Sequence, residues 1–415
     1  RFKIQDLTPA VTSRRAQATA VFLSSFAQGL VGSAFPASAA VLRARGLTDA
    51  QYGSIFLPQM ALAAAGAMGA GLVLGHVGAR RGLAAGFILL ALSPAALAAI
   101  AFVPEGAVYP LALLGTSLLG LGSGVSAGPL NAYPQVLFPS RSESAVVALH
   151  IAVGVGLALT PVLAGLALDG GAWLAVPALL AAANLALLLA VERQNLPEPE
   201  PRRHAGQGTR PTRAPALWLF AGTAFLYGVT ESCFGNWGVV FLTEERGLGV
   251  AAAGLALTAF WAALTGARFA VAAFVLRGSA GPVLPVLAAL MAGACLLVPL
   301  ARSPRGAVLA FALGGLGCSA VFPLTLGLAG RRFPDDRAWV SSALFTALVA
   351  GLGTGSLSTG LLHERLDLGT IYRLAALPSA LAAWLALRAA RELRRGGAPG
   401  LRDERIRPTP PPPAG

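Results

Sequence analysis

Residues 216–242 read ALWLFAGTAFLYGVTESCFGNWGVVFL, an apolar stretch long enough for a tilted helix to cross a lipid bilayer. Near its middle lies Glu231, whereas the other Asp and Glu residues of the chain fall in predicted loops, tails or helix ends. A carboxylate at bilayer depth costs about 2.5–3.5 kcal/mol even on lenient insertion scales. Such a residue therefore indicates a polar cavity or a proton-carrying role. The next apolar stretch holds the only basic residue at similar depth, Arg268.

The composition of the chain is that of a membrane protein. Hydrophobic residues make up 55% of its 415 positions, charged residues make up 12%, and the mean hydropathy is +0.69. A soluble domain carries about 25% charged residues, so we expect an integral membrane protein. The apolar runs show no two-residue alternation, which argues against a β-barrel. The net charge of +13 would suggest nucleic acid in a soluble protein, but arginines also anchor membrane loops, and we expect no nucleic-acid partner.

We predict an all-α membrane protein with twelve transmembrane helices in two six-helix, pseudo-symmetric bundles. The predicted spans are 17–42, 51–75, 82–103, 107–137, 144–168, 172–192, 216–242, 251–276, 282–301, 306–330, 338–363 and 370–390. The predicted parts are an N-terminal bundle (1–192), a cytoplasmic linker rich in Pro, Gly and charge (193–215), a C-terminal bundle (216–390) and a disordered cytoplasmic tail (391–415). Most of the 31 Lys and Arg residues then fall on one side, which predicts a multi-pass protein of the inner (plasma) membrane with both termini in the cytoplasm.

An internal repeat supports two matching halves. FAQGLVGSAF at 26–35 aligns with FLYGVTESCF at 225–234, and GLG at 120–122 aligns with GLG at 315–317. Phe138-Pro139 then falls on Phe333-Pro334 at the same offset. Six spans per half give the two copies the same topology, related by an axis along the membrane normal. Proteins built in this way hold small solutes near the membrane midplane, between the halves.

The polar residues within the spans follow helix faces. Spacing of three and four residues gathers Tyr227 and Glu231 on one face of the seventh span, and Trp261 and Arg268 on one face of the eighth. A polar stripe on an otherwise apolar helix is typical of a cavity wall. We predict that Glu231 is the proton-coupling residue. The residues that we predict to contact a solute are Gln28, Asn131, His150, Tyr227, Glu231, Asn236, Trp261, Arg268 and Thr346.

These candidates have alternative roles in packing. Glu231 can form a fixed ion pair or bond to a neighbouring helix, and Arg268 can anchor to backbone carbonyls. At 1.5 Å rise per residue their axial separation is about 10 Å, so a direct pair needs extended side chains. Asparagine can join two helices instead of binding a solute, and Trp261 and His150 can be packing residues.

Several segments resemble the major facilitator superfamily. The segment GLVLGHVGARR at 71–81 is similar to the family pattern G-x-x-x-D-R-x-G-R-R in its glycines and its basic pair, whereas Gly75 and His76 stand where the family has Asp and Arg. The segments 128–141, 227–248 and 315–330 resemble the fucose/glucose–proton symporter branch. Members of that branch often carry acids in the first half, but the first and fourth spans here have none. The resemblance implies a secondary transporter of small polar solutes such as sugars.

We therefore predict a monomeric transporter that moves a small polar solute, such as a sugar, by alternating access. We predict that solute movement is coupled to a proton through Glu231. Its partners would be the solute, the coupling proton and membrane lipid, with no cofactor. A proton-driven exporter of drugs or metabolites is an alternative, and a non-transporting receptor or scaffold is another. The chain has no G-x-x-x-x-G-K-[ST] motif for ATP and no metal-binding or nucleophile motif, so we do not expect an enzyme.

Overall fold

The computed structural model describes residues 13–194, 196–198, 211–277 and 280–395, with side chains given except at 70–77, 143, 272–277, 280, 338 and 392–395. Within these ranges every regular element is a helix. The first half contains α1 (Arg14–Gly32), α2 (Ala34–Ala37), α3 (Ala39–Ala44), α4 (Asp49–Ser54), α5 (Phe56–Val77), α6 (Ala79–Ala99), η1 (Ile100–Phe102), α7 (Glu105–Leu137), η2 (Pro139–Arg141), α8 (Ser142–Asp169) and α9 (Ala175–Arg193). The second half contains α10 (Pro215–Val240), η3 (Phe241–Glu245), α11 (Val250–Arg277), α12 (Ala280–Leu297), η4 (Val298–Leu300), α13 (Pro304–Cys318), α14 (Val321–Arg332), α15 (Arg337–His363) and α16 (Leu368–Arg395). The prediction of an all-α fold is confirmed.

Nine helices in the described part are long and apolar enough to cross a membrane. They correspond to the third to sixth and the eighth to twelfth predicted spans. The predicted spans 17–42, 51–75 and 216–242 are also helical, as α1–α3, α4–α5 and α10, but they are not among the nine. One reason is that α1 begins with two arginines and that α10 carries Glu231 and Asn236, which lower the mean hydropathy of these helices. A multi-pass membrane protein follows, and the count of twelve crossings stays a prediction.

Three spans are broken four residues before a proline. Proline has no N–H, so the carbonyl four residues earlier loses its helical partner and the helix tends to end there. α1 ends at Gly32, four residues before Pro36, and α4 ends at Ser54, four residues before Pro58. α13 ends at Cys318, and the next residue, Ser319, lies four positions before Pro323. Other prolines are accommodated without a break, because Pro129 and Pro134 lie inside α7 and Pro161 lies inside α8.

The two halves repeat the same close contacts. A Cβ atom added at Gly29 of α1 would lie 2.0 Å from the carbonyl oxygen of Val153, and one added at Gly228 of α10 would lie 2.4 Å from that of Leu348. These two glycines are aligned in the sequence repeat. The first glycines of the two GLG segments repeat this pattern. A Cβ atom added at Gly120 of α7 would lie 2.0 Å from a backbone oxygen of α5, and one added at Gly315 of α13 would lie 2.1 Å from a backbone oxygen of α11. Tight packing of small residues is typical of membrane helices. The fold is thus pseudo-symmetric, while the boundaries 1–192 and 216–390 stay a prediction.

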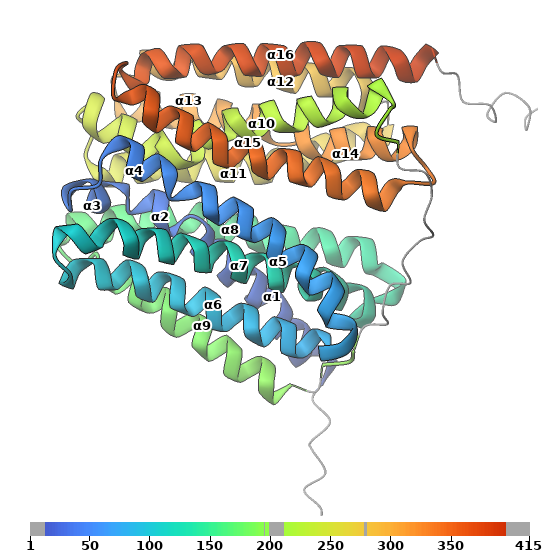
Figure 1. The fold of residues 1–415 in the computed structure, drawn as a ribbon, viewed down its shortest axis with the longest axis horizontal. Coiled ribbons are helices and arrows are strands. Elements are labelled where there is room, and N and C mark those ends of the chain that lie inside the picture. The colour runs from blue at the N-terminus through green and yellow to red at the C-terminus, as the bar shows by residue number, and fades with distance from the viewer. Residues whose placement is uncertain (1–12, 195, 199–210, 278–279, 396–415) are drawn as a thin grey trace, which may run out of the picture.

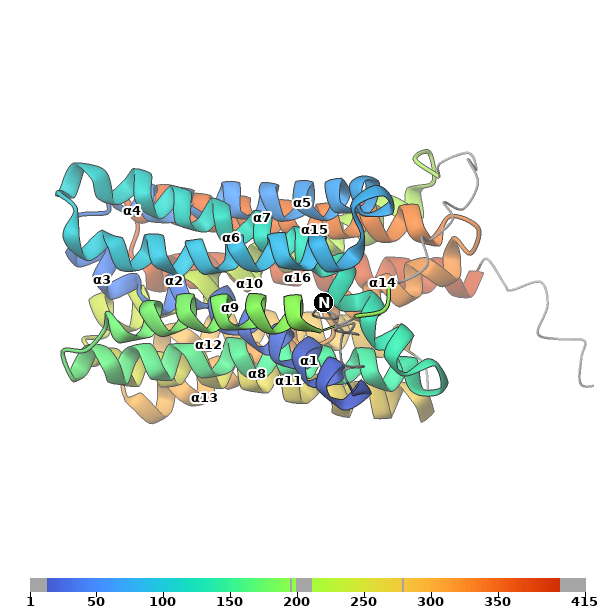
Figure 2. The same ribbon diagram turned by 90° about the horizontal axis from the view of Figure 1, so that it is seen from below.

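Helices of the first half lie together on one side of the molecule and those of the second half on the other (Figure 1). α1 begins and α16 ends at the same end of the bundle, which we call the terminal end; α2, α3 and α4 lie at the opposite, distal end (Figures 1 and 2). Two helix pairs join the halves, α8 with α11 and α4–α5 with α15. In the first pair the Thr258 hydroxyl donates to the carbonyl of Ala158 at 2.6 Å.

Several polar contacts join the halves at the distal end. Arg43 of α3 forms ion pairs with Asp49 of its own half at 2.7 Å and with Glu244 of the second half at 3.0 Å. The Tyr52 hydroxyl donates to the backbone carbonyl of Asn236 at 2.7 Å, and its ring packs edge-on against Trp237. Among the described residues, the hydrogen bonds and ion pairs that join the halves lie at the distal end or at mid-depth. The structure is therefore closed at the distal end, and we call these contacts the distal closure.

Part of the predicted linker contacts the first half. Glu198 accepts a hydrogen bond at 2.7 Å from the backbone N–H of Ala79, the first residue of α6. This N–H is one of those that a helix start leaves without an intrahelical partner, and a carboxylate there is favoured by the helix dipole. In the family pattern an Asp stands near this connection, at the position where this chain has Gly75. In this chain Glu198 of the linker supplies a carboxylate there. The remaining predicted tail, 396–415, lies outside the described residues.

Candidate functional site

Glu231 and Tyr227 lie one turn apart on α10. The Tyr227 side chain is buried, and its hydroxyl lies near the Glu231 carboxyl group. Glu231 is partly exposed. Its charge acts on Tyr227 of the same helix, on Arg268 of α11 and on Cys318 at the end of α13. These three neighbours belong to α10, α11 and α13 of the second half.

Arg268 is held by a backbone carbonyl of a neighbouring span. Its Nε donates to the carbonyl oxygen of Ser319 at 2.8 Å. In a continuous helix this oxygen would accept the N–H four residues later, but that residue is Pro323, which has none. The proline therefore leaves an acceptor free for the arginine. Among the described residues, the two Nη groups of Arg268 form no hydrogen bond.

His150 brings the first half of the molecule to the same place. It lies exposed on α8, near enough to Arg268 for the arginine charge to act on its ring. The Arg268 charge therefore acts both on His150 of the first half and on Glu231 of the second. The structure thus brings His150 of α8 and Tyr227 and Glu231 of α10 near the guanidinium of a fourth predicted residue, Arg268 of α11. We call these four residues the charged cluster.

The charged cluster contains no close ion pair. The ion pairs within 4.0 Å among the described residues are Arg43–Asp49, Arg43–Glu244 and the histidine pair His363–Asp49, and all of them lie at the distal end. Glu231 and Arg268 are therefore farther apart than a direct contact. The axial separation of about 10 Å stays a prediction.

Trp261 lies on α11 beside the charged cluster. Its indole ring packs edge-on against Phe260 at 5.0 Å between ring centroids, and a Cβ atom at Gly235 of α10 would lie 3.2 Å from it. The side chain is partly exposed, yet its Nε1 atom is buried and has no hydrogen-bond partner. A buried donor without an acceptor is uncommon in proteins. The indole N–H is thus a donor that the protein itself leaves unused.

The remaining predicted residues bond to the protein. The donor groups of three of them bond to backbone carbonyls: Gln28 to Ser123 of α7 at 3.3 Å, Asn131 to Ala127 at 2.8 Å and Thr346 to Ser342 at 2.9 Å. The Asn236 amide donates to the Ser356 hydroxyl of α15 at 2.6 Å. Asn236 also belongs to the distal closure through its backbone carbonyl. The helix-joining alternative therefore describes Asn236 as it stands here, whereas Gln28, Asn131 and Thr346 keep free acceptor atoms.

Cys318 and Ser319 are neighbours of the charged cluster that are not among the residues predicted from the sequence. Cys318 reads as an ordinary small packing residue, and its proximity to Glu231 depends on how α13 packs against α10. Ser319 carried a usable signal, because a residue four positions before a proline within a span has a free carbonyl. Arg43 and Tyr52 of the distal closure were also missed, since their partners lie about two hundred residues away and no local pattern connects them.

The comparisons with known proteins agree with a transporter fold. The family model described as Major Facilitator Superfamily matches residues 18–304, more than half of the chain. No curated protein matches the sequence. Among solved structures, a D-xylose–proton symporter is similar with a TM-score of 0.75 and 14% identity, covering 90% of this chain and 97% of that chain. The nucleoside transporter NupG is similar with a TM-score of 0.71 and 15% identity, covering 90% and 99%. A POT family transporter in complex with 5-aminolevulinic acid has a TM-score of 0.74 at 12% identity, covering 91% and 96%.

The family model, the helical bundle and the repeated halves lead to one assignment. They identify a membrane transporter and not an enzyme. The solved neighbours are too distant in sequence to show more than the fold, and the fucose/glucose branch is not singled out by them. This chain belongs to the Major Facilitator Superfamily.

Proposed function

We propose that the protein is a secondary active transporter that moves a small polar solute by alternating access and couples this movement to a proton through Glu231. The observation that carries the proposal is the charged cluster, in which Glu231 and Arg268 act on each other without direct contact. The solved neighbours include a proton symporter for D-xylose and a nucleoside transporter. We therefore expect a solute rich in hydroxyl or amide groups.

Glu231 has the surroundings that a proton carrier needs. Every other acidic residue of the described part lies in a loop or near a helix end, so Glu231 alone lies deep within a span. Desolvation favours the protonated form of a carboxyl group, and a nearby arginine favours the charged form. A cavity that opens to alternate sides changes both effects. Proton release can thereby be coupled to the presence of a solute next to Arg268.

Three groups are available to hold the solute. The free Nη groups of Arg268 can donate hydrogen bonds to hydroxyl or carbonyl oxygens, and guanidinium donors are fixed in direction. The unpaired indole N–H of Trp261 supplies another donor, and the ring offers an apolar face to C–H groups. His150 lies on the facing half and completes the site from the other side. A solute at this position would contact both halves, as alternating access requires.

The first test replaces Glu231 by glutamine. In proteoliposomes with an imposed proton gradient, the wild-type protein should concentrate a solute that is first identified by a thermal-shift screen of sugars, nucleosides, organic acids and short peptides. One charge crossing 100 mV is worth about 2.3 kcal/mol, or about 50-fold accumulation per proton. Glu231→Gln should abolish this accumulation and retain exchange of labelled for unlabelled solute, because the amide cannot release a proton.

The matched control is Glu192→Gln, the same change at an exposed position near the end of α9. This variant should accumulate solute like the wild type. If Glu231→Gln still concentrates the solute against its gradient, Glu231 is not the proton carrier. If neither the wild type nor any variant exchanges solute, the receptor or scaffold alternative replaces the proposal.

A further inference from the structure

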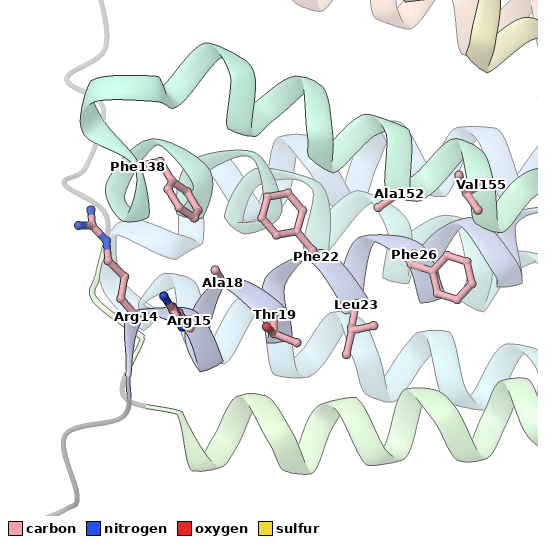
Figure 3. Close-up of a pocket in the computed structure, with 10 residues that line it drawn as sticks. All are labelled: Arg14, Arg15, Ala18, Thr19, Phe22, Leu23, Phe26, Phe138, Ala152 and Val155. Atoms are coloured by element: carbon pink, nitrogen blue, oxygen red, sulfur yellow. The ribbon is translucent and has the colours of Figure 1, made fainter.

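A groove on the outside of the first half is independent of the charged cluster. It has a volume of about 710 Å³ and lies along α1 beside α8 (Figure 3). Its walls are the apolar residues Phe22, Leu23, Phe26 and Val155, together with Phe138 at the end of α7. The mouth carries two arginines, Arg14 and Arg15, which begin α1. We call this feature the α1–α8 groove.

The α1–α8 groove faces the membrane. Two sides of α8 are already covered: Gly154 and Gly165 are in close contact with α11, and Gly156 is in close contact with α1. Ala152 lies on the α1 side of the helix, one turn before Gly156, whereas Val155 lies on a third side and is 49% exposed. Leu23 of α1 is 48% exposed. In a membrane protein such half-exposed apolar side chains contact acyl chains.

The cations at the mouth have no anionic partner among the residues that the structure describes. Neither Arg14 nor Arg15 forms an ion pair within 4.0 Å among the described residues, and both are exposed. The Arg14 guanidinium lies 5.8 Å from the centre of the Phe138 ring, which places it over the groove wall. Arginines in the first turn of a helix are also unfavourable for the helix dipole. A negatively charged group at this point would neutralise both arginines and the helix start.

The length of the groove matches one leaflet of a bilayer. From Arg14 to Phe26 there are twelve residues, or about 18 Å along a helix axis. Half of a hydrocarbon core of about 30 Å is about 15 Å. The cations therefore lie near the lipid headgroups when the aromatic end of the groove lies near the bilayer midplane. Polar mouth and apolar walls thus follow the order of headgroup and acyl chain.

We propose that the α1–α8 groove binds one anionic phospholipid, whose phosphate contacts Arg14 and Arg15 and whose acyl chain lies along Phe22, Leu23 and Phe26. The argument is charge complementarity at the mouth together with a lining that excludes a polar ligand. The lipid belongs to the leaflet at the terminal end of the bundle. This proposal does not depend on the solute or the coupling proton, because no residue of the charged cluster lines the groove.

Native mass spectrometry of the full chain tests the proposal. The purified protein is titrated with phosphatidylglycerol or phosphatidylcholine of identical acyl chains. The wild type should bind the first phosphatidylglycerol more tightly than phosphatidylcholine. Each arginine near an anionic headgroup contributes about a fivefold preference, so the double variant Arg14→Gln/Arg15→Gln should lose up to about thirtyfold in phosphatidylglycerol affinity. Its affinity for phosphatidylcholine should not change.

The matched control is Arg331→Gln/Arg332→Gln at the end of α14. It removes the same charge from the same end of the bundle, and Arg332 also lies over a phenylalanine, Phe333, at 5.4 Å, but these arginines do not line the groove. Its phosphatidylglycerol affinity should stay within twofold of the wild type. Equal losses in both double variants would overturn the proposal, since they would indicate non-specific charge attraction.

Two further variants test where the acyl chain lies and whether residues 1–12 occupy the groove instead of a lipid. Ala152→Phe places a ring in the groove and should weaken binding of both lipids while the arginines remain. Deletion of residues 1–12 removes the segment that precedes Ser13 and α1 in the sequence. Unchanged lipid binding in the deletion variant supports the proposal. A rise of tenfold or more would show that these residues occupy the groove instead, and the proposal would then be wrong.

Discussion

At the scale of single residues, the position of Arg268 depends on a missing N–H group on another helix. Pro323 cannot donate to the carbonyl of Ser319, and the arginine Nε takes the place of the absent donor at 2.8 Å. A hydrogen bond from a charged donor contributes about 1.5–3 kcal/mol. One nitrogen is used to fix the side chain, and the others face away from this anchor. The anchoring role and the binding role that the sequence left open for Arg268 are therefore compatible.

Replacing Pro323 by alanine should separate binding from stability. Alanine supplies the backbone N–H that α14 lacks, so it competes with Arg268 for the Ser319 carbonyl. We expect solute affinity to fall by about tenfold, measured by calorimetric titration. The melting temperature should stay the same or rise, because alanine favours a helix where proline disfavours it.

The control for this substitution is Pro378→Ala inside α16. It removes a proline from a helix interior of the same half, away from the charged cluster. Its affinity for the solute should equal that of the wild type. Unchanged affinity in Pro323→Ala would show that the carbonyl anchor does not position Arg268 for binding.

At the scale of helices, the repeat places glycines where two backbones touch. Gly315 of α13 lies so close to α11 that a Cβ atom would be 2.1 Å from the carbonyl oxygen of Phe260. Its counterpart Gly120 of α7 would place a Cβ atom 2.0 Å from the same atom of Gln59 in α5. Aligned residues thus make equivalent contacts between equivalent spans. The GLG segments are packing motifs, and they fix the distance between α11, which carries Arg268, and the span that carries Ser319.

Replacing Gly315 by alanine should destabilise this helix pair. The added methyl group would overlap a backbone oxygen, which cannot rotate away, so α11 and α13 must separate. Overpacking of a well-packed interior costs about 1–3 kcal/mol. We expect a lower melting temperature and a weaker hold on Arg268. Thermal unfolding in detergent, followed by tryptophan fluorescence, measures the first effect.

Gly327→Ala is the control at the level of the helix, because no atom lies within 4 Å of a Cβ atom added there. Alanine in place of an unconstrained helical glycine stabilises by about 0.5–1 kcal/mol. The two alanine variants should therefore shift the melting temperature in opposite directions. A shared direction would contradict the close packing of α13 against α11.

The sequence predicted the helices and their repeat well, but it predicted the contacts between helices poorly, for a physical reason. Apolar length, the repeat and the spacing of Tyr227, Glu231 and Arg268 depend on local periodicity. The α1–α8 groove was not predictable, since a side chain facing lipid and one facing another helix are equally apolar in a membrane. The Ser319 anchor lies between these cases, because Pro323 indicates a free carbonyl and only the fold shows which donor uses it.

At the scale of the whole molecule, the halves are closed at the distal end by a small set of polar contacts. Arg43, Tyr52 and Asn236 join elements of both halves there. Exposed ion pairs are worth about 0–1 kcal/mol each, and a neutral hydrogen bond is worth about 0.5–1.5 kcal/mol. A closure of this strength can be reversed by differential binding of a small solute. The arrangement is therefore compatible with the alternating access proposed above.

Removing polar contacts of the distal closure should shift the conformational equilibrium. The double variant Arg43→Gln/Tyr52→Phe loses both types of contact, and we expect the population open at the distal end to increase by about 5- to 30-fold. Spin labels at Gly106→Cys and Arg302→Cys, which are exposed at this end of the two halves, report the change as longer distances. The native cysteines are buried, so they remain unlabelled.

Tyr109→Phe is the matched control, because the Tyr109 hydroxyl bonds to Ser54 within the first half at 3.0 Å. It removes a distal hydrogen bond without affecting the contact between halves. Its distance distribution should match that of the wild type. Labels at Arg141→Cys and Arg331→Cys, at the terminal end, should move closer together in the double variant; unchanged distances at both ends would contradict alternating access.

Gly53 has a consequence for the interpretation of inactive variants of this protein. A Cβ atom there would lie 2.5 Å from the carbonyl oxygen of Ser356 in the opposite half. One methyl group would act as a wedge in the seam and hold it apart. An inherited or engineered change of this size would abolish turnover with every charge in place and every span correctly inserted, so an inactive variant is no proof of an injured binding site.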